Sequence, residues 1–233
     1  MRAAILPFLA FVFYHTSSAQ TCAGYYLFSK GDVEMTTFDA KGKEDGKVTF
    51  TVAEITKSGE DFISSFVSES RNKSGISLSK VPGKYRCSNG SLFLDAAVAA
   101  PREQMASYKD MDIQSSAYVE YPTRLVVNQS FRDTSFGFQV LNAASLYRSI
   151  TLNVTNRKVA AKETLVNRTG NWECYKITYD GKLTATDAAG LSTVYDYKCA
   201  EWFAQGFGIV KSETYSPTST IVSSFGIFSK KYN

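Results

Sequence analysis

The sequence of 233 residues contains a single histidine, His15, which lies in an N-terminal segment that we expect to be removed. A mature chain without histidine lacks the commonest general base of enzymes and the usual nitrogen ligand for zinc, copper and non-haem iron. The sequence also has no Cys-x-x-Cys pair and no Gly-x-Ser-x-Gly motif. These absences argue against metal, redox-cysteine and serine-hydrolase chemistry. We expect no cofactor and no metal site, and we favour binding over catalysis.

Long hydrophobic runs are missing, apart from one stretch near the N-terminus. Residues 3–14 are apolar, follow Arg2 and precede Ser17-Ser18-Ala19. This arrangement is typical of a secretory signal peptide, because a membrane-spanning helix needs about 20 apolar residues. We predict a signal peptide over residues 1–19 and a single β-rich domain over residues 20–233. The mature chain would have no transmembrane span and would be secreted across the inner membrane, into the periplasm or to the envelope.

Neither sign of charge dominates the chain. Its 26 basic and 22 acidic side chains give a net charge of +4 at pH 7. This charge is too small to indicate a nucleic acid or an anionic membrane surface as a partner.

The chain has few cysteines, and their number is even. An even number of cysteines in an exported chain favours disulfides. The four cysteines are Cys22, Cys87, Cys174 and Cys199. Residues 172–179 and 194–203 are expected to pair as a hairpin, and a register with Tyr179 opposite Val194 places Cys174 opposite Cys199. We therefore expect a Cys174–Cys199 disulfide, which leaves Cys22 and Cys87 as the second pair by subtraction.

Short alternating or β-branched runs, separated by turn residues, occupy most of the chain. Residues 33–39 and 47–56 alternate around a polar turn, which predicts a hairpin. Residues 96–110 are rich in alanine, with Pro101 suited to a first helical turn. We predict a mostly β fold: a large curled antiparallel sheet or half-open barrel of about a dozen strands, with one helix over residues 96–110.

Aromatic side chains recur at positions that would face the inside of such a sheet. Six of them are candidates for an apolar ligand groove: Tyr25, Tyr26, Phe28, Trp202, Phe203 and Phe207. Further aromatic candidates are Phe62, Phe66, Phe136 and Phe138. The alternative is that these residues fill an ordinary core, since a binding cleft must leave a cavity of several hundred Å³.

Charged side chains offer two weaker signals. Glycosidases can work with two carboxyl groups and no histidine, which keeps a hydrolase as an alternative. The candidate acids are Asp39, Glu120, Asp133, Glu173, Glu201 and Glu213. A basic cluster is formed by Arg157, Lys158, Lys162 and Arg168. We expect solvated ion pairs there, with an anionic head group or a partner protein as the alternative.

Several blocks of the chain carry a resemblance to a known family. They are Cys22–Gly31, Phe38–Lys43, Met105–Asp110, Asn156–Val159, Lys162–Thr164, Gly170–Tyr179 and Glu201–Tyr215. In this order they resemble the TapB-like family of exported proteins, common in Bacteroidota, over nearly the whole mature chain. The resemblance implies a β-rich fold, similar to the half-open barrels of periplasmic lipoprotein carriers, and a periplasmic or envelope location. It transfers no catalytic residue.

We predict a non-enzymatic envelope protein that binds an apolar ligand, such as a lipid or an acyl chain, on the concave face of its sheet. The helix over residues 96–110 would plug or gate that face. The first alternative is an interaction or scaffold module of an envelope or secretion complex, paired with a protein partner through an exposed sheet edge. The second is a carboxylate-dependent glycan hydrolase.

Overall fold

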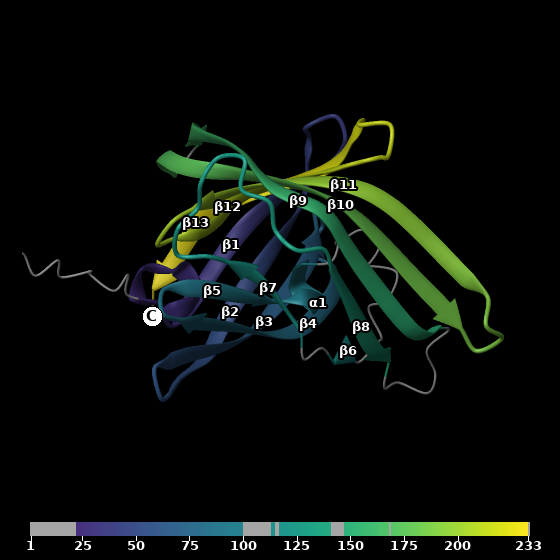
Figure 1. The fold of residues 1–233 in the computed structure, drawn as a ribbon, viewed down its shortest axis with the longest axis horizontal. Helices are drawn as coiled ribbons and strands as arrows, with labels where there is room; N and C mark the ends of the chain where they lie inside the picture. Colours follow the sequence, from purple (N-terminus) through teal and green to yellow (C-terminus); the bar gives the residue numbers. More distant parts are fainter. Residues whose placement is uncertain (1–21, 100–112, 115–116, 141–146, 168, 233) are drawn as a thin grey trace, which may run out of the picture.

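One antiparallel sheet makes up almost the whole described structure. The structure, a computed structural model, describes residues 22–99, 113–114, 117–140, 147–167 and 169–232. Its 13 strands lie in the order β6-β8-β9-β10-β11-β12-β13-β1-β2-β3-β4-β5-β7, and every neighbouring pair is antiparallel. The sheet curls into a half-barrel (Figure 1), which confirms the predicted fold class. The predicted signal peptide lies outside the described residues.

The strands span most of the chain, and the helical elements are short. The strands are β1 Gly31–Phe38, β2 Glu44–Ser58, β3 Asp61–Asn72, β4 Ser77–Ser88, β5 Ser91–Asp95, β6 Ile113–Gln114, β7 Tyr118–Tyr121, β8 Thr134–Val140, β9 Tyr147–Asn167, β10 Gly170–Asp187, β11 Ser192–Ala204, β12 Gly208–Tyr215 and β13 Ile221–Tyr232. The helical elements are η1 Cys22–Gly24, η2 Tyr26–Phe28 and α1 Ala96–Ala99. Of the predicted helix over residues 96–110, the described part is the four-residue α1, and residues 100–110 lie outside the described part. No helix among the described residues is long and apolar enough to cross a membrane.

The predicted hairpin of residues 33–39 and 47–56 is confirmed as β1 and β2. Its strands form because apolar residues alternate with polar ones, so that Val48, Phe50 and Val52 lie buried on one face. The turn between the strands is fixed by the Asp39 carboxylate, which accepts two backbone N–H groups. Gly42 supplies the positive φ of 73° that this turn requires.

The N-terminal segment η1–η2 plugs one end of the half-barrel. A disulfide between Cys22 and Cys87 joins this segment to β4, which confirms the second predicted cysteine pair. Tyr25 and Leu27 are each 2% exposed, and the Tyr26 ring lies 5.4 Å from the ring of Phe207. The segment is therefore part of the core, and we call this part of the molecule the plugged end.

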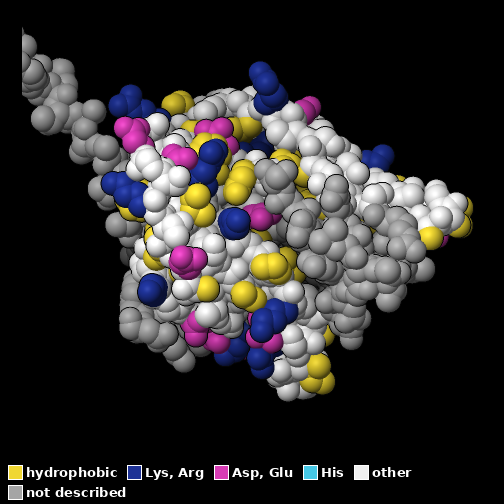
Figure 2. Space-filling model, turned by 90° about the horizontal axis from the view of Figure 1, so that it is seen from below, with side chains coloured by type: hydrophobic (Ala, Val, Ile, Leu, Met, Phe, Trp, Pro, Cys, Tyr) yellow, Lys and Arg dark blue, Asp and Glu magenta, His cyan; other side chains and the backbone are white. Residues whose placement is uncertain are grey.

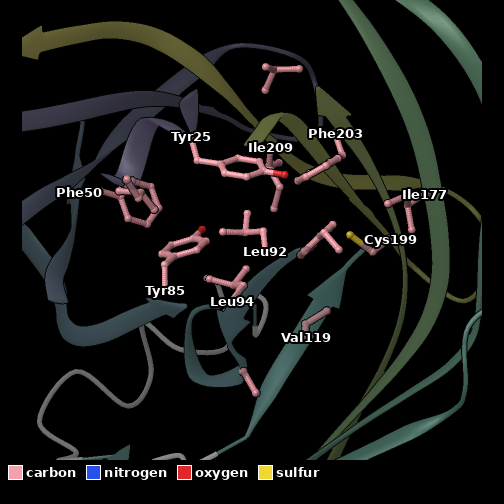
Figure 3. Packing of buried hydrophobic residues seen from close by; sticks show 14 of the residues in the cluster. Tyr25, Phe50, Tyr85, Leu92, Leu94, Val119, Ile177, Cys199, Phe203 and Ile209 are labelled. Carbon is pink, nitrogen blue, oxygen red and sulfur yellow. The ribbon is translucent and has the colours of Figure 1, made fainter. Parts of the chain in front are cut away.

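Side chains from both walls of the half-barrel meet in the core next to the plug. Figure 3 shows Ile177 and Cys199 from one wall and Leu92, Leu94 and Val119 from the other pointing into the same interior.

The outer surface seen from below has a mixed character. Among its coloured residues, acidic and basic side chains are interspersed with apolar ones (Figure 2).

The predicted Cys174–Cys199 disulfide is wrong, because the hairpin has a different register. Cys199 pairs with Tyr179, and Val194 pairs with Thr184, which is five residues away from the predicted partner. The strands are longer than predicted because Asp187 caps a tight turn by accepting the N–H groups of residues 189 and 191. Both Cys174 and Cys199 are buried and free.

Replacing both Cys22 and Cys87 with serine is expected to lower the free energy of unfolding by about 2–5 kcal/mol, because the crosslink restricts the unfolded chain. Denaturant unfolding with and without reductant measures this difference. The double variant should be insensitive to reductant, whereas the wild type should lose a similar amount of stability on reduction. Thiol labelling of the denatured, unreduced wild type should modify Cys174 and Cys199 only, and labelling of all four cysteines would contradict the pairing.

Candidate functional site

A carboxyl group lies buried on the inner face of the sheet at the plugged end. Glu201 on β11 is 4% exposed. It accepts hydrogen bonds from the hydroxyl groups of Tyr121 on β7, at 2.7 Å, and of Tyr179 on β10, at 3.1 Å. A buried acid needs such donors, because transfer from water to a protein interior is costly for a carboxyl group.

Arg157 on β9 forms the second polar element of this cluster. Its guanidinium group lies between two rings, 4.6 Å from the centre of the Tyr121 ring and 4.4 Å from that of Phe131. Its Nη1 donates to the backbone carbonyl of Glu120 at 2.6 Å. Its Nε and Nη2 have no hydrogen-bond partner among the described residues. An irregularity in β9 lets the side chain reach inward, because Asn156 takes a positive φ of 54°.

Burial controls the protonation of the groups in this cluster. It raises the pKa of the Glu201 carboxyl group, against the opposing effects of the Arg157 charge and the two tyrosine hydroxyls. Burial, followed by the charge of Glu201, raises the pKa of the Tyr121 hydroxyl. The tyrosines therefore stay protonated and act as donors to Glu201.

The two free thiols are not positioned for nucleophilic chemistry. Burial, together with nearby Glu201, raises the pKa of Cys199 to about 12, and its Sγ lies 3.4 Å from the Oγ of Ser212. Burial and the neighbouring charges of Glu163 and Glu173 raise the pKa of Cys174 to about 11. Since the thiolate is the reactive form of cysteine, both residues behave as small buried side chains.

The cluster joins the two ends of the sheet. Strand β7 is the last strand at one end, whereas β9, β10 and β11 lie near the other end. Tyr121 also stacks on Phe203 of β11, with ring centres 4.7 Å apart. Residues 128–131, which follow β7, continue along the edge of β9 through backbone hydrogen bonds to Arg157 and Val159. Polar and aromatic contacts therefore close the half-barrel at the plugged end.

Away from the plugged end, two apolar rows cross the inner face of β8–β11. The strand registers place Phe136, Leu152, Leu183 and Tyr195 side by side in one row. The second row consists of Phe138, Ile150 and Ala185, with Thr193 at its margin. The long strands that carry these apolar rows project away from the wall formed by β1–β5 (Figure 1). Apart from Tyr195 and Thr193, the members of the two rows are no more than 4% exposed and belong to the same buried cluster as the residues of the plugged end.

The six residues predicted to line a groove lie elsewhere. Five of them, Tyr25, Tyr26, Phe28, Trp202 and Phe203, are no more than 8% exposed, and Phe207 is partly buried against the same core. The structure brings Tyr25 to Phe203 and Tyr26 to Phe207, with ring centres 6.2 and 5.4 Å apart. Trp202 faces the opposite side of the sheet, between Lys176 and Lys211.

Two of the further aromatic candidates, Phe136 and Phe138, belong to the apolar rows. The aliphatic members of the rows were missed, although residues 150, 152 and 154 of β9 show the alternation of a half-buried strand. Sequence alternation identifies such positions but does not say which ones become neighbours.

The six candidate acids do not behave alike. Glu201 is the buried member of the set, and the remaining five are exposed or half-buried. The groups that contact Glu201 in the described structure are tyrosine hydroxyls rather than a second carboxyl group. Of the predicted basic cluster, Arg157 is buried, Lys158 and Lys162 are exposed, and Arg168 lies outside the described residues.

Comparison with known proteins identifies relatives by sequence and by fold. The DUF3108-like family matches residues 30–226. A Bacteroides fragilis protein described as exported, with a YmcC-like fold, superimposes with a TM-score of 0.71 at 16% identity, over 87% of this chain and 96% of that chain. A Parabacteroides distasonis protein described as a lipoprotein gives a TM-score of 0.74 at 18% identity, over 89% and 98% of the two chains. No curated protein matches the chain.

The Tyr121→Phe variant is expected to lower the free energy of unfolding by roughly 1.5–3 kcal/mol, because it removes a hydroxyl donor from a buried carboxyl group but keeps the ring. Urea unfolding measures the loss. Tyr118→Phe, on the other face of β7, serves as the control and should change stability by less than about 0.5 kcal/mol. Equal effects of the two substitutions would contradict the role of the Tyr121 hydroxyl.

The raised pKa of Glu201 predicts a pH-dependent contribution to stability. For an acid whose folded-state pKa exceeds its unfolded value, the contribution is fully present below the unfolded pKa and is lost as the pH rises through the folded pKa. Glu201→Gln cannot ionise, so its stability relative to wild type should increase as the pH is raised from about 4 to about 8. Urea unfolding across this range provides the test, with exposed Glu60→Gln as the control. A stability difference that is the same at every pH would rule out this linkage.

Proposed function

The chain belongs to the DUF3108-like family, and we propose that it is a non-enzymatic protein of the cell envelope that binds an apolar ligand, such as a lipid or an acyl chain, on its concave face. The predicted signal peptide, the resemblance to TapB-like proteins of Bacteroidota and the descriptions of the two solved neighbours as an exported protein and a lipoprotein support the location. The proposed ligand site is inferred from the arrangement of this chain's own residues.

The apolar rows are the observation that carries this proposal. Ordinary core packing at the plugged end already accounts for Tyr25, Phe203 and their neighbours. The rows are buried in the same cluster, on the part of the inner face away from the plug. They lie on β9 and β10, whose 21 and 18 residues make them far longer than typical strands. A ligand that binds there would have to open this packing. Curved sheets with an apolar inner surface are common sites for elongated apolar ligands.

Helix α1 supports the proposed gating of this face. It packs against β4, β5 and β7 and lies between the two walls of the half-barrel (Figure 1). Val98 approaches Gly83 closely, where an added Cβ would stand 2.7 Å from Cγ2 of Val98. Glycine at position 83 therefore gives α1 room on the inner side of β4.

The two alternatives find less support. A module that recruits a partner strand needs a long free edge. The terminal strands β6 and β7 have only 2 and 4 residues, although residues 160–167 of β9 pair with β10 alone among the described strands. A two-carboxylate hydrolase needs a second acid beside the first, and the neighbours of Glu201 in the described structure are Tyr121, Tyr179 and Arg157.

Two double variants on adjacent positions of β11 test the proposed face. Thr193→Arg with Tyr195→Arg places charge at the margin of the apolar rows, whereas Ser192→Arg with Val194→Arg places the same charge on the opposite face. The first pair should weaken binding of a fluorescent palmitate analogue about tenfold, or about 1.4 kcal/mol. The second pair should leave binding within about twofold of wild type.

Native mass spectrometry of the wild type after mild purification should also detect a co-purified lipid. Thermal unfolding of both double variants controls for loss of the fold. If no lipid co-purifies and the palmitate analogue binds all three proteins equally, or none of them, the proposed function is wrong.

A further inference from the structure

A polar groove lies over the convex face of β9, β10 and β11, and its lining also reaches Arg157, Tyr179 and Cys199 of the inner cluster. Its volume is about 670 Å³, within the range of pockets that hold small ligands. Its floor follows the strand registers: Lys158, Thr178 and Ala200 lie in one row, and Asp180 and Lys198 lie in the next. Because successive strand residues point to opposite faces, this floor is separate from the apolar rows.

Two connecting segments form the walls of the groove. Ser130, Phe131 and Asp133 come from the segment between β7 and β8, and Tyr215 and Ser219 come from the end of β12 and the turn that follows it. Each wall therefore supplies one aromatic ring and at least one hydroxyl group. Such a lining offers both apolar faces and hydrogen-bonding groups to a ligand.

The basic side chains of the groove are available to a ligand. Lys158, Lys176 and Lys198 form no salt bridge with any described carboxylate. Lys198 donates to the hydroxyl of Ser219 at 3.3 Å, and the Lys176 ammonium lies 4.8 Å from the Trp202 ring. Neither contact neutralises the positive charge.

The acidic side chains of the groove are already engaged by one residue, Asn156. The Asp133 carboxylate accepts the backbone N–H of Asn156 at 3.0 Å, and the Asp180 carboxylate accepts its side-chain amide at 2.8 Å. Asn156 lies at the irregularity in β9 that turns Arg157 inward, and its hydrogen bonds hold both carboxylates in place. The groove is lined by four basic groups, the three lysines and Arg157, against two carboxylates, so its net charge is 4 − 2 = +2.

We propose that this groove binds an anionic carbohydrate. The three lysines would hold a carboxylate or phosphate group through charge-assisted hydrogen bonds. The hydroxyl groups of Ser130, Thr178 and Ser219 suit the hydroxyl groups of a sugar, and the rings of Phe131 and Tyr215 suit the apolar faces of its rings. This site is independent of the apolar ligand proposed above, because it lies on the other face of the sheet.

Calorimetric titration of the mature protein tests the site with four probes: trigalacturonate, glucose-6-phosphate, neutral maltotriose and inorganic phosphate. At least one of the two anionic sugars should bind saturably. Maltotriose and phosphate should each bind at least about tenfold more weakly, because each lacks one half of the recognised chemistry. Binding of trigalacturonate alone identifies a carboxylated ligand, and binding of glucose-6-phosphate alone identifies a phosphorylated one.

The double variant Lys158→Glu with Lys198→Glu changes two exposed groove residues and should weaken the bound sugar at least about tenfold. The matched control, Lys80→Glu with Lys84→Glu, makes the same charge change at exposed positions of β4 and should stay within about twofold of wild type. Both double variants should bind the palmitate analogue as the wild type does. Three outcomes overturn the proposal: no anionic sugar binds, phosphate alone binds as tightly as the sugars, or both double variants lose affinity equally.

Discussion

The hydrogen bond of 2.7 Å between the Tyr121 hydroxyl and the Glu201 carboxyl group holds the half-barrel closed at its plugged end. It links β7, the last strand at one end of the sheet, to β11 near the other end, and backbone hydrogen bonds between residues 128–131 and β9 support the same closure. Arg157 adds a second link through the carbonyl of Glu120. An unpartnered buried carboxyl group is strongly destabilising. The folded state is therefore stable only when β7 brings the Tyr121 hydroxyl to Glu201.

Closure divides the inside of the half-barrel into two parts with different properties. At the plugged end, the disulfide-linked segment with Tyr25 and Tyr26 packs against Phe203 and Phe207, so that aromatic side chains fill the interior. Farther along the long strands, the inner face carries the apolar rows, which are buried in the same cluster. The plugged end and the apolar rows are therefore two parts of one buried cluster. The convex groove uses the opposite face of those strands, and the irregularity at Asn156 contributes to both faces.

Local features of the fold could be predicted from the sequence, whereas contacts between distant segments could not. The alternation at Val48, Phe50 and Val52 predicted the β1–β2 hairpin, and the series of short strand-like runs separated by turn residues predicted a curled antiparallel sheet. The register of β10 and β11 could not be predicted, because several residues between positions 180 and 193 suit either a strand or a loop. The hydrogen bonds that the Asp187 carboxylate accepts fix the position of the turn. In the resulting register, Cys199 lies opposite Tyr179 and not opposite Cys174.

The candidate site shows the same limit. Glu201 appeared among the candidate acids, but its partner Tyr121 lies 80 residues earlier, on a strand of 4 residues. The buried role of the predicted groove aromatics depends on the path of residues 22–28 into the half-barrel, for which the local sequence gives no signal. Similarly, Lys158, Lys176 and Lys198 come together only through the registers of three strands.

Hydrogen–deuterium exchange with and without bound palmitate tests the central claim most directly, namely that the long strands carry an apolar binding surface separate from the plugged end. The account predicts stronger protection of the strand segments that bear the apolar rows, residues 149–154, 181–187 and 192–195. Exchange at β1, β12 and the segment of residues 22–28 should stay unchanged. Protection concentrated at the plugged end, or no change anywhere at saturating palmitate, would contradict the account.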